Sequence, residues 1–225
     1  MNKKILIMAN GPSLNNIDLK RLNIDSFGMN NAYKYYENMQ WYPTFWGCFD
    51  DKMTAHNKNQ HKEFILRGMC QEYFTLNKEF KDLPKVSYVD SPIWRQTTMK
   101  HYKNQPFKNV GHTGANCVQV AINKGYEEIY LIGFDGHYNG KNPSDIKGGI
   151  IKDGERQYAW KGYRGETEVF NPLVVKIIDI NLTTWKHLSE WSIKNNIKVI
   201  NLNKNSQVMQ GLFECQDPDT SLIYN

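Results

Sequence analysis

The fold is decided by residues 113–135, which read TGANCVQVAINKGYEEIYLIGFD. Thr113 is a residue type that caps helices, and the apolar residues behind it recur at helical spacing as far as Gly125, a typical helix stop: Ala115, Val118, Ala121 and Ile122. Residues 128–133, EIYLIG, form a short apolar run that predicts a buried strand. The pattern therefore predicts a helix that leads into a strand ending at Phe134-Asp135-Gly136.

Similar patterns lie on both sides of this unit. Residues 4–9, 26–30, 44–49, 72–76, 85–89 and 197–202 predict further strands, whereas residues 15–22, 51–67 and 171–195 favour helices or helical turns. Short apolar strands that alternate with helices predict a mostly parallel sheet with helices on both faces. We therefore expect a single Rossmann-like α/β domain over residues 1–225, a length that can bury one core.

Three stretches do not fit the strand–helix alternation. Residues 91–109 are polar and aromatic without a clear period, so we expect a loop with a short helix, and residues 203–225 are expected to be a polar tail. Residues 136–170 are rich in Gly, Lys and Tyr and are too long for an ordinary connection. Because long loops in compact domains are usually functional, they predict a lid-like insertion after the strand at 128–133.

The composition excludes several classes of protein. With 40% hydrophobic and 13% aromatic residues the chain is not disordered. Its net charge of +5 is modest and its lysines are dispersed, which indicates a solvated surface more than a preference for anionic ligands, and we expect no nucleic acid partner. The four cysteines form no CxxC pair, so zinc spacing is absent, and Cys48 and Cys117 are expected to be small buried hydrophobes in a reducing compartment.

The chain carries no recognisable targeting segment. Lysines precede an apolar run at the start, but that run covers only residues 5–9 and is too short for a signal peptide. No stretch approaches the ~20 apolar residues of a membrane helix. We expect a cytoplasmic protein, with peripheral membrane association and homo-oligomerisation both compatible with its composition.

Polar or glycine-rich residues follow several of the predicted strands. They are Asn10-Gly11, Asn30-Asn31, Asp50-Asp51, Asp135-Gly136 and residues 203–206. Ligands of open parallel sheets bind outside the carboxyl ends of the strands. We therefore expect these groups to share one edge of the sheet and to form a binding site.

The first of these turns is Asn10-Gly11-Pro12-Ser13. Gly11 allows close backbone approach, Pro12 restricts the turn and Ser13 is expected to cap the next helix, so free N–H groups there would suit a phosphate. An ordinary turn with a helix cap explains the same residues. The motif is neither a P-loop nor GxGxxG, so the usual ATP and NAD signatures are absent.

Two further segments carry candidate chemistry. Residues 111–116 place small residues at the start of a predicted helix. His112 lies among them, and because the ordinary pKa of histidine is about 6.5, it is either a general base or a loop residue without a role. Residues 135–140 include His137 and are followed by a loop that contains Tyr158, Tyr163, Arg164, Glu166 and Glu168. Phenol or imidazole donors could stabilise a leaving phosphate, and carboxylates or histidine could deprotonate an acceptor hydroxyl. A flexible surface loop explains the same residues.

These segments together resemble the bacterial lipooligosaccharide sialyltransferases. That family carries a GNGPSL-like start, a Ser-Gly helix start, a GYKEIYL-x-G-x-D strand and a late C-x-N-S-L segment. Here residues 9–14 read ANGPSL, the helix starts at Thr113-Gly114, residues 125–135 read GYEEIYLIGFD and residues 203–207 read NKNSQ. The pattern is shared with the motility accessory factor and hydroxymethylpterin pyrophosphokinase-like proteins.

The resemblance implies a transferase for glycan biosynthesis, such as that of lipopolysaccharide. It implies that a sugar moves from a nucleotide-activated, CMP-linked donor to a hydroxyl of a glycan acceptor, without a required cofactor. Asn10 and Asn30 match asparagines that contact the cytidine nucleotide, Asp50 is nearest to a third, and Thr113-Gly114 matches the Ser-Gly at the helix start. The donor-binding residues are thus predicted to be Asn10, Gly11, Ser13, Asn30, Asp50, Thr113, Gly114 and Asp135.

The catalytic residues are predicted from the same resemblance. Two family tyrosines hold the leaving phosphate. The first falls on His137, beside Tyr138, and the second on Tyr158 or Tyr163, of which Tyr163 is taken. The late histidine that serves the family as general base is missing, and Glu166, Glu168 or His137 would replace it. The predicted catalytic set is His137, Tyr138, Tyr163 and Glu166.

Two other functions remain open from the sequence. Asp50 in place of asparagine resembles the pyrophosphokinase-like group, in which a carboxylate could hold Mg²⁺ beside phosphates. A Mg²⁺-dependent phosphoryl transfer would then use Asp50 or Asp135. The third hypothesis is a non-catalytic domain that binds a nucleotide sugar or a glycan.

Overall fold

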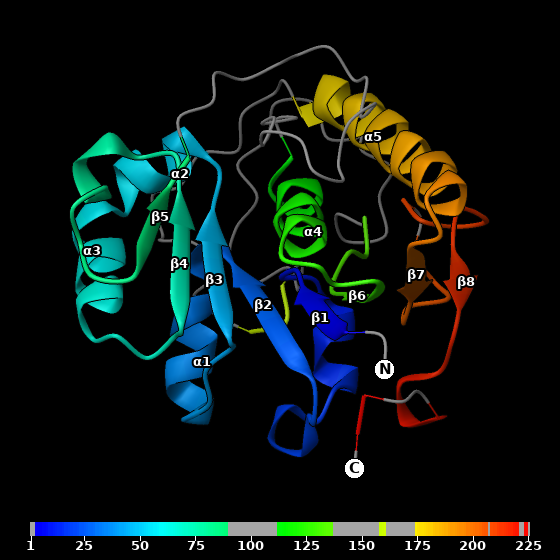
Figure 1. The fold of residues 1–225 in the computed structure, drawn as a ribbon, viewed down its shortest axis with the longest axis horizontal. Coiled ribbons are helices and arrows are strands. Elements are labelled where there is room, and N and C mark those ends of the chain that lie inside the picture. The colour runs from blue at the N-terminus through cyan, green and yellow to red at the C-terminus, as the bar shows by residue number, and fades with distance from the viewer. Residues whose placement is uncertain are drawn as a thin grey trace.

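The computed structural model describes residues 3–89, 112–136, 158–160, 174–206, 208–220 and 223–224. Its centre is one parallel eight-stranded sheet in the order β5-β4-β3-β2-β1-β6-β7-β8 (Figure 1). The strands are β1 (Lys4–Met8), β2 (Asp25–Met29), β3 (Phe45–Cys48), β4 (Glu72–Thr75), β5 (Val86–Tyr88), β6 (Glu128–Ile132), β7 (Lys198–Asn201) and β8 (Glu214–Cys215). The predicted Rossmann-like α/β fold is therefore confirmed.

Helices pack on both faces of the sheet. The α-helices are α1 (Tyr33–Met39), α2 (Asp51–His56), α3 (Lys58–Leu66), α4 (Thr113–Asn123) and α5 (Val174–Lys194), and the short 3-10 helices are η1 (Pro12–Asn16), η2 (Leu19–Arg21), η3 (Asn30–Ala32), η4 (Lys78–Phe80) and η6 (Pro218–Thr220). Alternate residues of each strand face opposite sides. Ile5 and Ile7 of β1 accordingly join the core beneath α4 and α5, whereas Leu6 and Met8 join the core beneath η1 and α1.

The order of the strands reverses at β1. From β1 the chain adds β2 to β5 on one side, then returns through α4 to add β6 and β7 on the other side (Figure 1). In doubly wound sheets a ligand cleft forms outside the carboxyl ends of the strands at such a reversal. The turns after β1 and β6 meet at this position, because β1 and β6 pair along their whole length from Lys4↔Glu128 to Met8↔Ile132.

The structure corrects several predicted elements. Residues 51–67 form two helices that are separated at Asn57. Residues 15–22 contain the end of η1 and all of η2, which agrees with the predicted helical turn. The polar tail contains the edge strand β8, and the tyrosine-rich helix α1 was not predicted. Residues 91–109 and most of the expected insertion at 136–170 lie outside the described residues, so those predictions stay untested.

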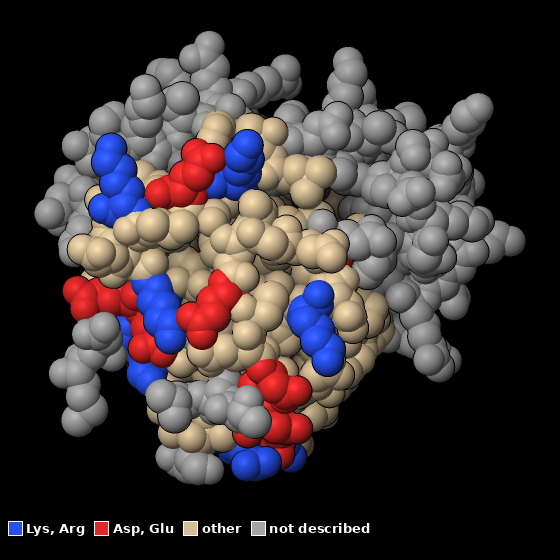
Figure 2. Space-filling view, turned by 90° about the vertical axis from the view of Figure 1, so that its right-hand side faces the viewer, with Lys and Arg blue, Asp and Glu red and all other residues tan. Residues whose placement is uncertain are grey.

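Burial and surface charge agree with the composition. Cys48 and Cys117 are 1% and 0% exposed, as predicted. On the face shown in Figure 2, basic and acidic side chains are interspersed and neither sign forms a continuous patch among the coloured residues. No helix in the described part of the chain has both the length and the hydropathy of a membrane span.

Candidate functional site

The turns after β1 and β6 lie in direct backbone contact. The Gly11 amide donates a hydrogen bond to the Gly133 carbonyl oxygen at 2.8 Å. A Cβ atom on Gly11 would lie 2.0 Å from Asp135 Oδ2 and 2.6 Å from the Gly133 carbonyl oxygen, so any other residue would force one of the two turns to shift. Gly11 was predicted to allow close backbone approach, and it does so here to the neighbouring turn of the protein itself.

Asp135 joins three turns through its carboxylate. Its Oδ2 accepts from Ser13 Oγ at 2.8 Å, its Oδ1 accepts from Asn203 Nδ2 at 3.1 Å, and the Ser13 amide lies 3.2 and 3.3 Å from the two oxygens. The Gly133 amide donates in turn to Ser13 Oγ at 3.1 Å. Asp135 therefore ties the turns after β1, β6 and β7 together, and its direct contact with a donor remains a prediction.

Ser13 does not cap a helix, which corrects the sequence-based prediction. The N-cap of η1 is Gly11, which has no side-chain cap hydrogen bond, and Ser13 lies within η1. The Ser13 hydroxyl instead completes the network of Asp135. Capping was the local explanation for a serine after Gly-Pro, whereas its true partner lies 122 residues away in sequence.

Asn10 and Asn30 occupy equivalent positions on neighbouring strands. Met8 of β1 pairs with Gly28 of β2, so each asparagine lies two residues beyond a paired position at the same edge of the sheet. Asn10 is only 8% exposed. Asn30 has a φ of 55°, in the left-handed region that asparagine tolerates, and its Oδ1 is buried without a hydrogen-bond partner among the described residues.

Asp50 follows β3 but has a structural partner. Its Oδ1 accepts from the Met53 amide at 2.9 Å and thereby caps α2. The side chain is exposed. Among the described residues, no group of three or more His, Cys, Asp or Glu side chains could hold a metal ion.

The start of α4 differs from the prediction in its cap. His112, not Thr113, is the N-cap residue, and its Nδ1 accepts from the Ala115 amide at 3.1 Å. The ring packs edge-on against Trp185 at 5.1 Å. Desolvation lowers the pKa of His112 to about 4, which keeps Nδ1 unprotonated for the cap. A histidine with this pKa is a poor general base near neutrality, and its role at the helix start is structural.

Gly114 allows the start of α4 to pack against the turn after β6. A Cβ atom at this position would lie 2.2 Å from Cε1 of Phe134 and 3.0 Å from Cε1 of His112. The Phe134 ring in turn packs edge-on against Trp185 at 5.1 Å. The predicted donor residues Thr113 and Gly114 are thus brought beside the turn that carries Asp135, at the same edge as Asn10.

Residues 158–160 lie against the first turn, which sequence reasoning did not predict. The Ala159 amide donates to the Asn10 carbonyl oxygen at 2.9 Å, and Asn15 Nδ2 donates to the Ala159 carbonyl oxygen at 2.9 Å. Trp160 stacks on Tyr35 of α1 with ring centroids 4.9 Å apart. Tyr158, one of the two tyrosines considered for the leaving phosphate, is therefore next to a residue that contacts the site.

The predicted catalytic residues cannot be placed in the same way. His137, Tyr138, Tyr163 and Glu166 lie outside the described residues, as do Arg164 and Glu168. Their roles remain predictions.

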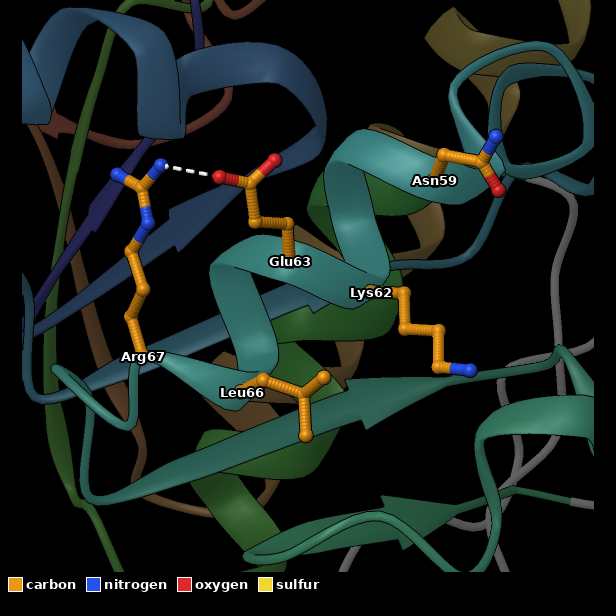
Figure 3. Close-up of a pocket in the computed structure, with 5 residues that line it drawn as sticks. All are labelled: Asn59, Lys62, Glu63, Leu66 and Arg67. Atoms are coloured by element: carbon orange, nitrogen blue, oxygen red, sulfur yellow. Dashed lines mark hydrogen bonds and ion pairs between the residues drawn. The ribbon is translucent and has the colours of Figure 1, made fainter.

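One surface hollow of about 420 Å³ lies elsewhere, on the exposed side of α3 (Figure 3). It is lined by Asn59, Lys62, Glu63, Leu66 and Arg67, and Arg67 extends toward Glu63, with which it forms an ion pair at 2.8 Å. None of the predicted site residues lines this hollow, so it is separate from the site at the strand ends.

Comparisons with solved structures support the fold described above. No family model matches the chain, and no curated protein sequence matches it. The sialyltransferase CstII from Campylobacter jejuni, solved in complex with cytidine-5'-monophosphate, superposes with a TM-score of 0.56 at 18% identity over 98% of this chain and 87% of CstII. The chain has the fold of these sialyltransferases.

Two other glycosyltransferases share it. The α-2,3-sialyltransferase Cst-I from Campylobacter jejuni superposes with a TM-score of 0.56 at 16% identity, over 98% of this chain and 83% of Cst-I. The MAf glycosyltransferase from Magnetospirillum magneticum AMB-1 has a TM-score of 0.57 at 13% identity, over 99% of this chain and 35% of the larger protein. The resemblance seen in the sequence is thus confirmed for the fold.

Proposed function

We propose that the protein is a glycosyltransferase that transfers a sugar from a CMP-linked donor to a glycan hydroxyl. The observation that carries the proposal is the joining of three strand-end turns by Asp135 at the reversal of strand order. Asn10 and Asn30 each lie two residues beyond the paired residues Met8 and Gly28, at the same edge of the sheet. The position is where open α/β sheets bind nucleotides. The shared fold with CMP-binding sialyltransferases supports the same assignment.

The asparagine side chains suit the nucleoside of the donor. The buried Oδ1 of Asn30 can accept a hydrogen bond from a base amino group or a ribose hydroxyl. Burying an acceptor without a partner costs free energy, which a bound ligand would recover. Asn10, Thr113 and Gly114 then line the same edge of the sheet and hold the rest of the donor.

Catalysis would rest on positioning the donor and stabilising its departing phosphate. The contact between Ala159 and Asn10 supports Tyr158 as the second phosphate-binding hydroxyl, and Tyr163 is the alternative. His137 and Tyr138 are proposed to supply the first. Glu166 or His137 is proposed as the general base, because the low pKa of His112 disfavours that residue.

The metal-dependent alternative has less support. Asp50 caps α2, and Asp135 accepts hydrogen bonds from Ser13 and Asn203. A carboxylate that must give up these partners is a poorer Mg²⁺ ligand than an unengaged one. These hydrogen bonds favour a transferase that uses protein side chains rather than a phosphoryl transfer built on Asp50 or Asp135.

Hydrolysis of CMP-, UDP- and GDP-linked sugars by the full chain tests the proposal. We expect release of CMP from a CMP-linked sugar, undiminished by EDTA, and a large loss of turnover in Tyr158→Phe. A large loss in Tyr163→Phe instead would assign the second hydroxyl to Tyr163. Activity that requires ATP and Mg²⁺ would instead establish the phosphoryl-transfer function. Tight nucleotide binding without turnover of any donor or acceptor would establish a non-catalytic binding domain.

A further inference from the structure

Two buried ring N–H groups hold the turn that follows β2. Trp46 Nε1 donates to the Asn30 carbonyl oxygen at 3.0 Å, and His61 Nε2 lies 3.1 Å from Asn31 Oδ1, to which it donates. Trp46 comes from β3 and is 1% exposed, whereas His61 comes from α3 and is completely buried. One buried donor therefore holds the backbone of Asn30, and the other holds the side chain of Asn31.

His61 occupies a place in the core that an apolar residue would normally fill. Its ring packs edge-on against Tyr33 at 5.6 Å and against Trp46 at 5.2 Å. Burial, with a smaller contribution from Lys34, lowers its pKa to about 4, so the ring is neutral. Its Nδ1 is buried and has no hydrogen-bond partner among the described residues. Such an atom is unfavourable in a core, and the hydrogen bond made by Nε2 offsets that cost.

The turn adopts a left-handed conformation that asparagine tolerates but few other residue types do, and the contacts from Trp46 and His61 can hold it in place. Asn30 has a φ of 55°, and the N-cap position of η3, Met29, makes no side-chain cap hydrogen bond. The conformation sets the direction in which the Asn30 side chain leaves the end of β2. Asn31 is almost completely buried, so its hydrogen bond with His61 links the turn to the core and can fix this direction.

We infer that His61 is a positioning residue for the donor site, acting with Trp46 to fix the Asn30–Asn31 turn so that Asn30 Oδ1 faces the nucleotide. The inference rests on the proposed function. His61 does not touch the ligand: it acts through Asn31. The role extends the site from the strand ends into α3, an element that none of the predicted donor residues occupies.

Two variants at His61 separate the N–H donor from the packing of the ring. His61→Phe keeps an aromatic ring and removes the donor, whereas His61→Gln places an amide N–H at a similar distance from the backbone. Calorimetric titration with CMP should show a dissociation constant raised about tenfold, the equivalent of one hydrogen bond, in His61→Phe, and within about threefold of wild type in His61→Gln. Equal weakening in both variants, or none in His61→Phe, would overturn the inference.

A double-mutant cycle tests whether His61 acts through Asn30. In an Asn30→Ala background, His61→Phe should weaken CMP binding little further, because the side chain that it positions is gone. Full additivity of the two effects would mean that His61 stabilises the protein generally, and would reject a positioning role. Trp46→Phe is the companion variant and should behave like His61→Phe.

A readout without ligand separates this inference from the proposed function. Amide hydrogen exchange at Asn31 and Ala32 should quicken in His61→Phe and remain near wild type in His61→Gln. Faster exchange in His61→Phe, combined with a wild-type protein that binds no CMP, would reject the nucleotide site but retain the link from His61 to the turn. Unchanged exchange would reject the positioning role, whatever the protein binds.

Discussion

Replacement of Asp135 by alanine should loosen three turns at once. The substitution removes the acceptors for Ser13 Oγ, the Ser13 amide and Asn203 Nδ2, which lie 2.8 to 3.3 Å from the carboxylate. Hydrogen bonds to a charged group contribute about 1.5–3 kcal/mol each. Because Asp135 is half-buried, water can hydrogen-bond to the groups left without a partner and reduce the loss. Taking about 1 kcal/mol for each of three donors, we expect a loss of about 3 kcal/mol in the free energy of unfolding.

Urea unfolding followed by circular dichroism measures this loss. Asp135→Asn keeps one oxygen and the side-chain volume, so it should cost less, about 1–2 kcal/mol. Asp50→Ala is a matched control, because it removes a carboxylate that makes only one cap hydrogen bond, and should cost about 1 kcal/mol. In a cycle with Ser13→Ala the effects of Asp135→Ala should be strongly non-additive, since the two side chains share a hydrogen bond.

A difference of under about 0.5 kcal/mol between Asp135→Ala and wild type would refute the reasoning, because surface substitutions without structural partners fall in that range. Additivity with Ser13→Ala would refute it as well. Either result would mean that the three turns hold their positions without the carboxylate, and would return Asp135 to the list of side chains available for a ligand.

Three other predictions follow from the same contacts. Gly11→Ala should destabilise the fold by at least about 2 kcal/mol, measured by thermal unfolding, because the new methyl group would lie 2.0 Å from Asp135 Oδ2; an unchanged melting temperature would contradict this. The free energy of unfolding should fall as the pH drops from about 6.5 toward 4, because His112 binds a proton in the unfolded chain but stays neutral in the fold. His112→Asn retains a capping side chain and should lessen this pH dependence. An equal pH dependence in the variant would argue against a low pKa for His112. Tyr126→Phe removes a 2.5 Å hydrogen bond to the carboxylate at the start of β2 and should cost about 1–2 kcal/mol in urea unfolding, and a variant as stable as wild type would show that solvent replaces the bond.

Seven of the eight strands were predictable because each is a short apolar run between polar turns, whereas the two-residue edge strand β8 is too short to show such a run. The run EIYLIG became β6, and the helical spacing from Ala115 to Ile122 became α4. Helix α1 was missed because three of its first four residues are tyrosines, which favour strands locally. Two of them, Tyr33 and Tyr36, are nevertheless buried in the core beneath the sheet, where packing outweighs that preference.

The candidate site was only partly predictable. Asn10, Asn30 and Gly114 were expected at one edge of the sheet, and the register of β1 with β2 places the two asparagines there. Gly11 was expected to approach a ligand, and it approaches Asp135. The contribution of residues 158–160, and of His61 behind Asn31, could not be seen, because nothing in their local sequence points to the partner they contact.

The period of apolar residues, together with Gly, Pro and Asn at the turns, was enough to predict seven of the eight strands, helices α4 and α5, and the polar residues that follow the strands. Which groups meet at the strand ends followed only from the three-dimensional fold: the Ser13 hydroxyl meets Asp135 across 122 positions, and the Asn10 carbonyl oxygen meets the Ala159 amide. Such pairs depend on the order in which strands assemble beside β1. That order follows from the packing of the whole sheet, and no local spacing in the chain contains it.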